Sequence, residues 1–449
     1  MLAMIETENK KKVFIETYGC QMNFSDSEII GSILMEHNYI STDDMKSADL
    51  ILMNTCSIRD NAEQRVRNRL QELHALKKRK SSLVIGLLGC MAERLKEKLL
   101  EEEKHIDLIV GPDGYRSLPA LLEQVESGQK AVNTLLSAEE TYADITPVRL
   151  GSNGVNAFIS IMRGCENFCA YCVVPYTRGK ERSRNPKTII EEAAALFDQG
   201  YREVTLLGQN VNSYQWEDNG LPIEFPALLE DVAKVNPLLR VRFATSHPKD
   251  LSDDLLDVIA TYPNICHAIH LPVQSGSNEI LKKMNRSYTR EWYLDRVAAI
   301  KKHLPDCAIS TDIIAGFCSE TEEDHKDTLS MMEIVGYDYA FMFKYSERPN
   351  TIAAKKYSDD VSEEDKSRRL DEIISMQQKL SLASNKKDIG KVFEVLVEGV
   401  SKRSDTQLYG RNSQNKVVVF PRSSHKPGDY VRVLVEDCTP ATLRGVEVK

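Results

Sequence analysis

Three apolar segments near the N-terminus each end at a cysteine, and this pattern constrains the fold more than any other feature. The segments are KKVFIETYGC, ADLILMNTC and SLVIGLLGC, which end at Cys20, Cys56 and Cys90. A fourth apolar run, IDLIVG, follows, and amphipathic stretches such as DSEIIGSILMEHN and AEQRVRNRLQELHALKKRK separate the runs. Continuous apolar strands that alternate with amphipathic helices predict a parallel α/β sheet, which we expect to form a domain over residues 11–130.

These three cysteines share one topological position, although 36 and 34 residues separate them. Because the C-terminal ends of parallel strands line one crevice, the thiols can converge there without a local motif. Each cysteine also precedes a predicted helix start (NFSDSE, SIRDNAE or MAERLKE), where a thiolate is favoured over a thiol. A single strand-end cysteine is more often a core residue, but three together favour a three-thiolate site with an open position.

A second alternating segment follows a polar, turn-rich linker, ETYADITPVRLGSNGVNA. Its six strand candidates are AFISIMRGC, EVTLLGQN, VRFATSH, HAIHLPVQ, AISTDIIAGF and YDYAFMFKYS, and helix-like runs such as PKTIIEEAAALFDQG and REWYLDRVAAIKKHL separate most of them. Six βα units predict a partial (βα)6 TIM-like barrel over residues 151–383, with its chemistry at the C-terminal ends of the strands.

The last part of the chain has a different pattern. Residues 358–384 predict a long charged helix. A small OB-like β-barrel is predicted over 384–449 from five short strands, KVFEVLVEGV, QLYGRN, KVVVF, DYVRVLVED and TLRGVEV. The chain carries a net charge of -9, yet residues 385–449 hold 12 Lys and Arg against 8 Asp and Glu. This asymmetry is a weak indication of a polyanion-binding module, and a merely lysine-rich tail explains it equally well.

The cysteine content indicates a reduced compartment. No stretch approaches the roughly 20 apolar residues of a membrane span, and the N-terminal MLAMIETENKKKVF lacks a secretory pattern. We therefore expect a cytoplasmic protein, in which ten cysteines favour metal binding or catalysis over disulfides. Cys266, Cys307 and Cys438 are expected to be small hydrophobic residues, whereas Cys318 follows a barrel strand and its role stays open.

Cys165, Cys169 and Cys172 form a C-x3-C-x2-C motif directly after the first barrel strand. Three thiolates in a tight loop can hold three irons of a four-iron cluster, which leaves the fourth iron open to a small molecule. A structural zinc site would want a fourth Cys or His nearby, and the adjacent loop has none.

This motif, with Tyr171 before its last cysteine, resembles the radical S-adenosylmethionine (SAM) superfamily. The resemblance implies a [4Fe-4S] cluster on Cys165, Cys169 and Cys172, whose open iron binds SAM and whose electron cleaves it to an adenosyl radical. With its second three-cysteine site and C-terminal barrel, nearly the whole chain resembles the methylthiotransferases, which join an N-terminal cluster domain, a radical SAM core and an RNA-binding TRAM domain.

Three sequences, YGCQMNFSDSE, NTCSIRDNAEQRV and PYTRGKERSR, resemble the MiaB-type branch of that family. The resemblance implies a transferase that places a methylthio group on C2 of N6-dimethylallyladenosine beside the anticodon of tRNA. One SAM would methylate sulfur at an auxiliary [4Fe-4S] cluster on Cys20, Cys56 and Cys90, and a second would give the radical. The two open iron sites would have to face each other across a base held out of its stack in a dry pocket.

Three alternatives stay open. Two are the same chemistry on tRNA with threonylcarbamoyl adenosine or on a ribosomal-protein aspartate, and the third is a non-catalytic metal-containing RNA-binding protein. The chain also departs from the family pattern twice, with GFCSET where members often read GFPGET and RPNT where they often read RPGT. Both departures fall at turn positions, where Gly or Pro sets the backbone.

Barrel strand ends supply the candidate cofactor contacts, and no catalytic residue is assigned beyond the cluster ligands. The candidate SAM contacts are Tyr171, Gly208, Gln209, Ser246, Gln274, Ser275, Asp312, Ile314 and Gly316, and an ordinary barrel or loop role is about equally expected for each. His247 and His270 also lie at strand ends, where we expect satisfied core histidines.

The C-terminal barrel supplies the candidate RNA contacts. Phosphate contacts are expected from Lys386, Lys387, Arg403, Arg411 and Lys416. The basic helix over residues 65–80 is a second candidate, which a solvated face explains as well. The expected partners are tRNA and an electron donor such as flavodoxin or ferredoxin, with no membrane and a monomeric chain.

Overall fold

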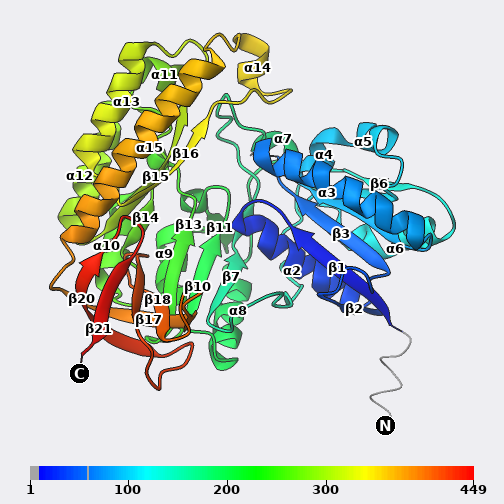
Figure 1. Cartoon of the computed structure of the whole chain (residues 1–449), viewed down its shortest axis with the longest axis horizontal. Helices are drawn as coiled ribbons and strands as arrows, with labels where there is room; N and C mark the ends of the chain where they lie inside the picture. Colours follow the sequence, from blue (N-terminus) through cyan, green and yellow to red (C-terminus); the bar gives the residue numbers. More distant parts are fainter. Residues whose placement is uncertain (1–9, 58–59, 449) are drawn as a thin grey trace. The chain divides into compact units, whose positions relative to one another are not determined.

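The computed structural model describes residues 10–57 and 60–448, and the chain divides into two compact units (Figure 1). The first unit comprises Met1–Gly151, Met162–Asn167 and Cys172–Arg184, and the second comprises Ser152–Ile161, Phe168–Tyr171 and Asn185–Lys449. The predicted boundaries near 130, 151 and 384 follow sequence segments rather than these units, and they stay predictions.

The first unit contains a parallel sheet of six strands in the order β2-β1-β3-β4-β5-β6. Its strands are β1 (Lys11–Thr17), β2 (Tyr39–Ser41), β3 (Leu50–Thr55), β4 (Val84–Gly89), β5 (Leu108–Val110) and β6 (Ala131–Asn133). The predicted α/β class is confirmed. Strands β2 and β6 escaped prediction because their sequences, YIS and AVN, are not continuously apolar, unlike the equally short LIV of β5.

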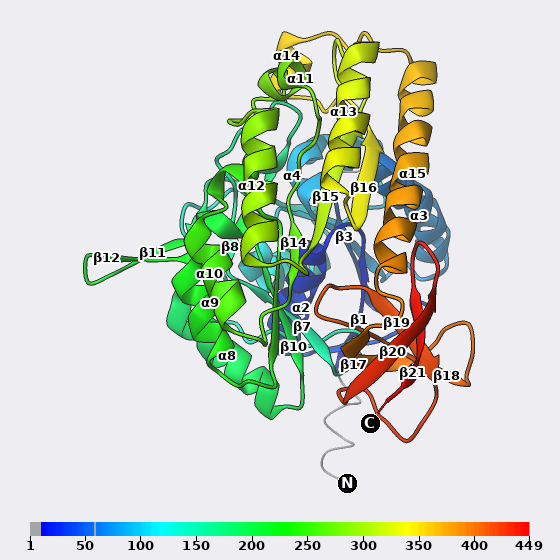
Figure 2. The same cartoon turned by 90° about the vertical axis from the view of Figure 1, so that its left-hand side faces the viewer.

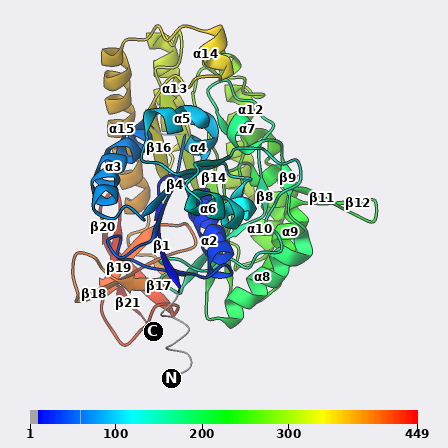
Figure 3. The same cartoon turned by 90° about the vertical axis from the view of Figure 1, so that its right-hand side faces the viewer.

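Two helical layers cover this sheet (Figure 3). Helices α2 (Gln21–Met35) and α6 (Leu118–Glu126) pack on one face, and α3 (Asp60–Arg79), α4 (Cys90–Leu95) and α5 (Glu97–Glu102) pack on the other. Strand β3 alternates between the two cores, since Leu50 and Leu52 belong to one and Ile51 and Met53 to the other. This burial of both faces explains why the strand sequences are continuously apolar.

Two of the three predicted helix starts differ in detail, and one of them is α4, which begins at Cys90 itself rather than at Met91. Helix α2 begins at Gln21, directly after Cys20, rather than at the apolar run that opens with Asp26. Helix α3 begins at Asp60, and Ile58 and Arg59 of the predicted SIRDNAE start lie outside the described residues.

The first unit also includes the segment around the C-x3-C-x2-C motif. Strand β8 (Met162–Arg163) pairs antiparallel with β9 (Arg182–Ser183), and helix α7 (Val174–Arg178) packs against α4. The predicted single strand AFISIMRGC is therefore wrong at its end, because β7 stops at Ser160 and residues 162–163 pair elsewhere. The chain turns at Gly164, whose φ is +81° and where a Cβ would lie 1.8 Å from the Lys180 carbonyl oxygen.

The second unit contains the predicted open barrel, which is confirmed. Two parallel sheets, β13-β10-β7 and β14-β15-β16, are joined by a bridge between Val241 and Ile265. The strands are β7 (Asn156–Ser160), β10 (Glu203–Leu207), β13 (Arg240–Ala244), β14 (Ala268–His270), β15 (Ala308–Ala315) and β16 (Tyr339–Lys344). Figure 2 shows helices on the outside of these strands, among them α8 (Pro186–Asp198), α9 (Phe225–Ala233), α10 (Asp253–Thr261), α12 (Arg290–His303), α13 (Glu322–Val335) and α15 (Glu363–Lys386).

Shorter elements lie in the segments that connect the longer strands and helices of this barrel. They are the hairpin of β11 (Gln215–Asp218) and β12 (Leu221–Glu224), helix α11 (Asn278–Lys283) and helix α14 (Ile352–Lys356).

The C-terminal strands close into a small barrel in the order β17-β18-β19-β21-β20. These strands are β17 (Val392–Val400), β18 (Gln407–Arg411), β19 (Val417–Pro421), β20 (Tyr430–Cys438) and β21 (Leu443–Glu447). Buried arginines of β13 donate to its backbone: Arg240 Nη1 to the Arg411 carbonyl at 2.8 Å and Arg242 Nη2 to the Asn412 carbonyl at 2.7 Å. The expected OB-like barrel is confirmed.

A search of the described helices finds none with the length and apolar character that a membrane crossing requires.

Both departures from the family turn sequences fall on left-handed backbone. Ser319 of GFCSET has a φ of 62° and Asn350 of RPNT has a φ of 70°, so each stands where glycine would be unstrained. Asp360 holds the serine in place, because it accepts hydrogen bonds from the Ser319 backbone N–H at 2.6 Å and from its hydroxyl at 3.2 Å.

Replacing Ser319 by glycine should raise the free energy of unfolding by about 1 kcal/mol, because it removes the left-handed strain. Asn350→Gly is the matched control and should change it less, since asparagine tolerates this conformation. Anaerobic urea titrations of the two variants and the wild type would measure this. A Ser319→Gly protein less stable than wild type would show that the Asp360 hydrogen bonds outweigh the strain.

Candidate functional site: two groups of cysteines and a buried arginine network

The three N-terminal cysteines lie at the same edge of the first unit's sheet. Cys20 follows β1 and caps α2, Cys56 follows β3, and Cys90 is the first residue of α4 after β4. Strands β1, β3 and β4 are direct neighbours, and their ends are level, with Thr17 opposite Asn54 and Thr55 opposite Gly89. The fold therefore brings these thiols to one end of the sheet, and their role as cluster ligands stays a prediction.

The backbone next to Cys20 leaves space for the Cys56 side chain to approach closely. Gly19 has a φ of +119°, and a Cβ there would lie 2.4 Å from the Cβ of Cys56 and 3.1 Å from its sulfur. Asn23 accepts a hydrogen bond from the Cys20 thiol at 3.6 Å and donates to the Tyr18 carbonyl at 2.7 Å. A glycine at position 19 thus leaves room for the Cys56 side chain next to the residue that precedes Cys20.

The expectation that helix starts favour thiolate is wrong for Cys90. Burial raises the pKa of its thiol, and the nearby guanidinium of Arg178 only partly opposes this effect. Desolvation of the buried sulfur is the largest cause of this rise, and helix α4, which Cys90 begins, is only six residues long.

Two cysteines of the C-x3-C-x2-C motif belong to the same unit. The Cys165 sulfur accepts from the Asn167 amide at 3.4 Å, and the Cys172 sulfur accepts from the Val174 backbone N–H at 3.4 Å. Helix α7 begins at that Val174, so the last cysteine of the motif lies at the helix start. The Cys165 N–H donates to the Gly179 carbonyl at 3.2 Å, which closes the loop.

The third cysteine of the motif, Cys169, belongs to the second unit and lies against an arginine that sequence reasoning missed. Arg286 donates from Nη1 to the Cys169 sulfur at 3.2 Å. Its other nitrogens bind the Tyr288 hydroxyl at 2.9 Å and the Pro272 carbonyl at 2.9 Å. Arg286 stands in KKMNRSYTR, and nothing in that stretch distinguishes it from a surface arginine.

A second missed feature is a buried network of charges in the first unit. Asp26 on α2 accepts from Arg163 at 2.8 Å and from Arg178 at 2.7 Å, while Asp113 accepts from Arg182 at 2.9 Å. Both carboxylates have no solvent exposure and the arginine side chains at most 4%. Burial opposes ionisation of Asp26, but the two arginines outweigh it and lower its pKa.

The donor chemistry of the two sites, three thiols each, fits iron–sulfur clusters. Within the described residues, no group of three or more His, Cys, Asp or Glu side chains is placed to hold one ion. A four-iron cluster takes each thiolate on a different iron, so its ligands stand further apart. The buried guanidinium groups beside Cys90 and Cys169 also fit a site that becomes anionic when it is filled.

Most of the candidate SAM residues follow the C-terminal ends of barrel strands, whereas Asp312 and Ile314 lie within β15 and Tyr171 lies in the cysteine loop. Asp312 on β15 lies 3.5 Å from His270, Ser246 donates to Asn212 at 3.1 Å, and the Gly316 N–H donates to Glu320 at 2.7 Å. Ser275 is fully buried, with its hydroxyl 3.3 Å from that of Thr328. Gly208 is buried and Tyr171, Gln209 and Ile314 are half-buried, while Gln274 has a φ of 70°. Their contacts with SAM stay predictions.

The two strand-end histidines differ from each other. His247 is buried, its Nδ1 accepts from the Lys249 N–H at 3.3 Å, and its ring lies 5.7 Å from that of Tyr288. Burial, with the nearby Arg286, lowers the pKa of His247 to about 2. His270 is half-buried, with its Nδ1 3.0 Å from the Ser310 hydroxyl.

The candidate RNA contacts fall into two groups. Lys386, Lys387 and Arg403 are exposed, and their phosphate contacts stay predictions. Lys416 is tied down within the chain, 2.7 Å from Asp388 and 3.2 Å from Asp338, and Arg411 lies 3.2 Å from Glu398. Because these carboxylates already neutralise them, Arg411 and Lys416 are not carried into the RNA-binding proposal.

The second RNA candidate is helix α3 with its basic run over 65–80. Several of its basic side chains already form ion pairs within the chain. Arg69 pairs with Glu16 at 2.8 Å, Lys80 pairs with Asp49 at 2.7 Å, and Lys77 pairs with Asp107.

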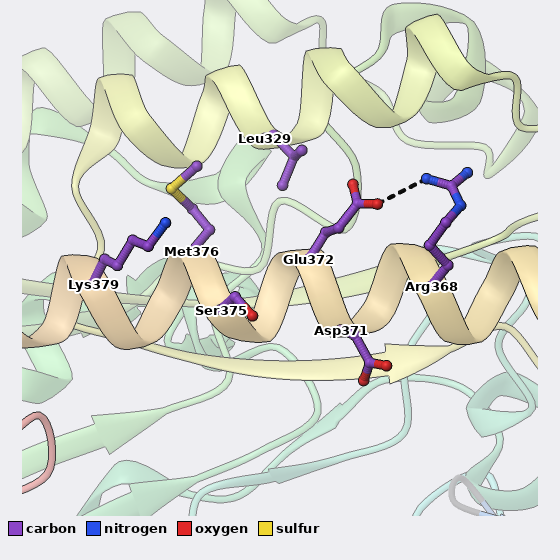
Figure 4. Close-up of a pocket in the computed structure, with 7 residues that line it drawn as sticks. All are labelled: Leu329, Arg368, Asp371, Glu372, Ser375, Met376 and Lys379. Carbon is purple, nitrogen blue, oxygen red and sulfur yellow. Dashed lines mark hydrogen bonds and ion pairs between the residues drawn. The ribbon is translucent and has the colours of Figure 1, made fainter.

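A surface cavity of about 620 Å³ lies between α13 and α15 (Figure 4). Leu329 of α13 faces Met376 of α15 across it, and Arg368 and Glu372 pair at 2.8 Å at one end. No predicted site residue lines it.

Three family models match the chain in succession. The uncharacterized protein family UPF0004 matches residues 12–111, the radical SAM superfamily matches 159–332, and the TRAM domain matches 386–448.

Curated relatives match almost end to end. Proteins named tRNA-2-methylthio-N(6)-dimethylallyladenosine synthase from Bacteroides fragilis and Amoebophilus asiaticus are 59% and 58% identical to the chain. The alignments cover 98% and 97% of this chain, and 96% and 92% of the relatives.

Solved structures resemble the fold at low identity. The radical SAM methyltransferase TsrM from Kitasatospora setae has a TM-score of 0.57 at 15% identity, covering 77% of this chain and 75% of its own. The cobalamin-dependent SAM radical enzyme OxsB has a TM-score of 0.54 at 12% identity, covering 84% of this chain and 57% of its own. At such identity the resemblance supports the fold alone.

Asp26→Asn should lower the free energy of unfolding by about 3–5 kcal/mol, because it leaves two buried guanidinium groups without their shared carboxylate. Asp144→Asn is the matched control, since Asp144 pairs with Arg116 at an exposed position and should change stability little. Anaerobic urea titration of both variants measures the difference. Equal stabilities would contradict the structural role of Asp26.

His247 should give the protein a pH-dependent stability in acid. Because its pKa is lowered from 6.5 to about 2, the stability is present above pH 6.5 and falls by about 1.4 kcal/mol per pH unit below it. His247→Gln should lose that slope, whereas His303→Gln, at a surface pair with Asp257, should keep it. Urea midpoints between pH 5.5 and 7.5 test this, and parallel curves for wild type and His247→Gln would contradict it.

Proposed function

The chain belongs to the tRNA-2-methylthio-N(6)-dimethylallyladenosine synthase family within the radical SAM superfamily, and we propose that it carries out this reaction. It acts as a transferase that installs a methylthio group at C2 of N6-dimethylallyladenosine beside the anticodon of tRNA. The observation that carries the proposal is the placement of Cys20, Cys56 and Cys90 at three neighbouring strand ends, in a chain that also holds the C-x3-C-x2-C motif.

Each of the two sets of three cysteines holds one [4Fe-4S] cluster in this proposal. Cys165, Cys169 and Cys172 hold the cluster that binds SAM, and Cys20, Cys56 and Cys90 hold the auxiliary cluster. When bound, the clusters and two SAM molecules supply the adenosyl radical, the methyl group and the sulfur.

The chain's own residues position these groups and exclude water. Arg286 fixes the Cys169 sulfur from a buried position that Tyr288 and Pro272 define. Gly19 leaves space beside Cys56, and Gly164 turns the backbone into the cysteine motif. Backbone and side chains at the ends of the barrel strands, including Gly208, Gln209, Ser246 and Asp312, contact SAM in this proposal.

The tRNA is bound through the C-terminal barrel, which the TRAM match covers. Arg403 is exposed on the barrel, Lys386 and Lys387 are exposed at the end of α15 within the same match, and all three contact phosphates in this proposal. An electron donor such as flavodoxin or ferredoxin reduces the protein, which works as a monomer in the cytoplasm.

The relatives favour tRNA over the other targets. Their printed names specify dimethylallyladenosine, and the chain carries YGCQMNFSDSE at its first cysteine. Nucleoside analysis of tRNA from a deletion strain decides the target, and the methylthio nucleoside should disappear. Its persistence in that strain would contradict the tRNA assignment.

The auxiliary site can be separated from the radical site by a triple variant. Cys20→Ala, Cys56→Ala and Cys90→Ala together should reduce about eight irons per chain to about four. The variant should still cleave SAM and should make no methylthiolated product. Iron and sulfide analysis, SAM cleavage and nucleoside analysis measure the three outcomes.

A double variant of unassigned cysteines is the matched control. Cys266→Ala with Cys307→Ala should keep about eight irons and full product formation. Loss of SAM cleavage in the triple variant, or retention of its iron, would contradict the assignment of the two sites.

A further inference from the structure

Arg178 is a buried cation with one unused donor, and it belongs to neither cysteine group. It is the last residue of α7, the five-residue helix that starts beside Cys172. Its Nη2 donates to Asp26 at 2.7 Å and to Asn23 at 3.2 Å. Its Nη1 is buried and has no hydrogen-bond partner among the described residues. Leaving a charged donor unpaired in the interior costs more than leaving a neutral one.

The surroundings show which groups lie near this guanidinium. Asn23, which Arg178 contacts, also accepts the hydrogen bond from the Cys20 thiol at 3.6 Å. Helix α4, which begins at Cys90, packs against α7. The guanidinium interacts electrostatically with the thiols of Cys90 and Cys20. Two of the three strand-end thiols, those of Cys90 and Cys20, therefore lie near enough to the guanidinium to interact with its charge.

The guanidinium groups of the network outnumber the carboxylates that they contact. Arg163, Arg178 and Arg182 share the carboxylates of Asp26 and Asp113, so three positive charges meet two negative ones. Arg163 and Arg182 use their remaining donors on the carbonyls of Pro112, Ser137 and Glu140. Among these three arginines, Arg178 is thus the one with a buried donor that no described residue accepts, and it lies near two of the strand-end thiols.

We infer that Arg178 donates a charge-assisted hydrogen bond from Nη1 to an anionic sulfur of the auxiliary cluster, and so sets the charge balance of that site. This inference rests on the proposed function, because it needs the cluster on Cys20, Cys56 and Cys90. Asp26 and Asn23 fix the guanidinium, so the donor is in place before the cluster binds. Hydrogen bonds to cluster sulfurs and nearby positive charge raise the reduction potential.

The reduction potential of the auxiliary cluster tests the inference. The full-length chain with Cys165→Ala, Cys169→Ala and Cys172→Ala carries only this cluster, and its midpoint is measured by redox titration followed by electron paramagnetic resonance. Adding Arg178→Met should shift the midpoint to more negative potential without loss of auxiliary iron. Arg178→Lys keeps the positive charge and should shift the midpoint less. If the Arg178→Met protein does not fold, the lysine variant provides the test.

Arg163→Lys is the matched control, because Arg163 pairs with the same Asp26 but uses its other donors elsewhere. It should leave the midpoint unchanged even if it lowers stability. A wild-type midpoint in both Arg178 variants, or an equal shift in Arg163→Lys, would overturn the inference. Absence of any cluster before Arg178 is changed would instead contradict the proposed function.

Discussion

The buried pairing of Arg163 and Arg178 with Asp26 holds the first unit together around its cysteines. Asp26 comes from the helix that Cys20 caps, and both arginines come from the segment that surrounds the C-x3-C-x2-C motif. Burying these charges is costly unless each finds its partner with good geometry. The pairing therefore specifies one arrangement of α2, β8 and α7, and slipped arrangements would leave a charge unpaired in the interior.

This arrangement explains why residues 162–167 and 172–184 pack with the N-terminal sheet and not with the barrel strand that precedes them. Helix α7 is only five residues long, yet Cys172 lies at its start and Arg178 at its end. The N-terminal sheet and the second half of the cysteine motif thus form one structural body. A change in the packing of α2 would be felt at Cys165 and Cys172 through the arginines that both segments share.

Much of the fold can be predicted from the apolar pattern of the sequence. Most of the buried charged residues that surround the cysteines cannot. Strands β3, β4 and β5 are visible because they are buried on both faces, whereas β1 is only partly buried and is visible from its short apolar run. The cysteine groups are visible because spacing and strand-end position identify them. Arg286, Asp26 and Arg178 were missed because a buried arginine and a surface arginine look alike in sequence. Conversely, Lys416 was predicted to contact phosphate, but Asp338 and Asp388 from distant parts of the chain neutralise its charge. The fold shows where a strand ends, but only tertiary packing decides which charges face each other.

The attachment of the C-terminal barrel has an evolutionary consequence. Arg240 and Arg242 of β13 bind the main-chain carbonyls of Arg411 and Asn412, and not their side chains. Every amino acid offers the same carbonyl, so these two hydrogen bonds would survive an exchange of the side chains at positions 411 and 412. The next two residues are less exchangeable, because the Ser413 hydroxyl accepts from the His267 N–H at 2.8 Å and the Gln414 amide donates to Asp306 at 2.8 Å.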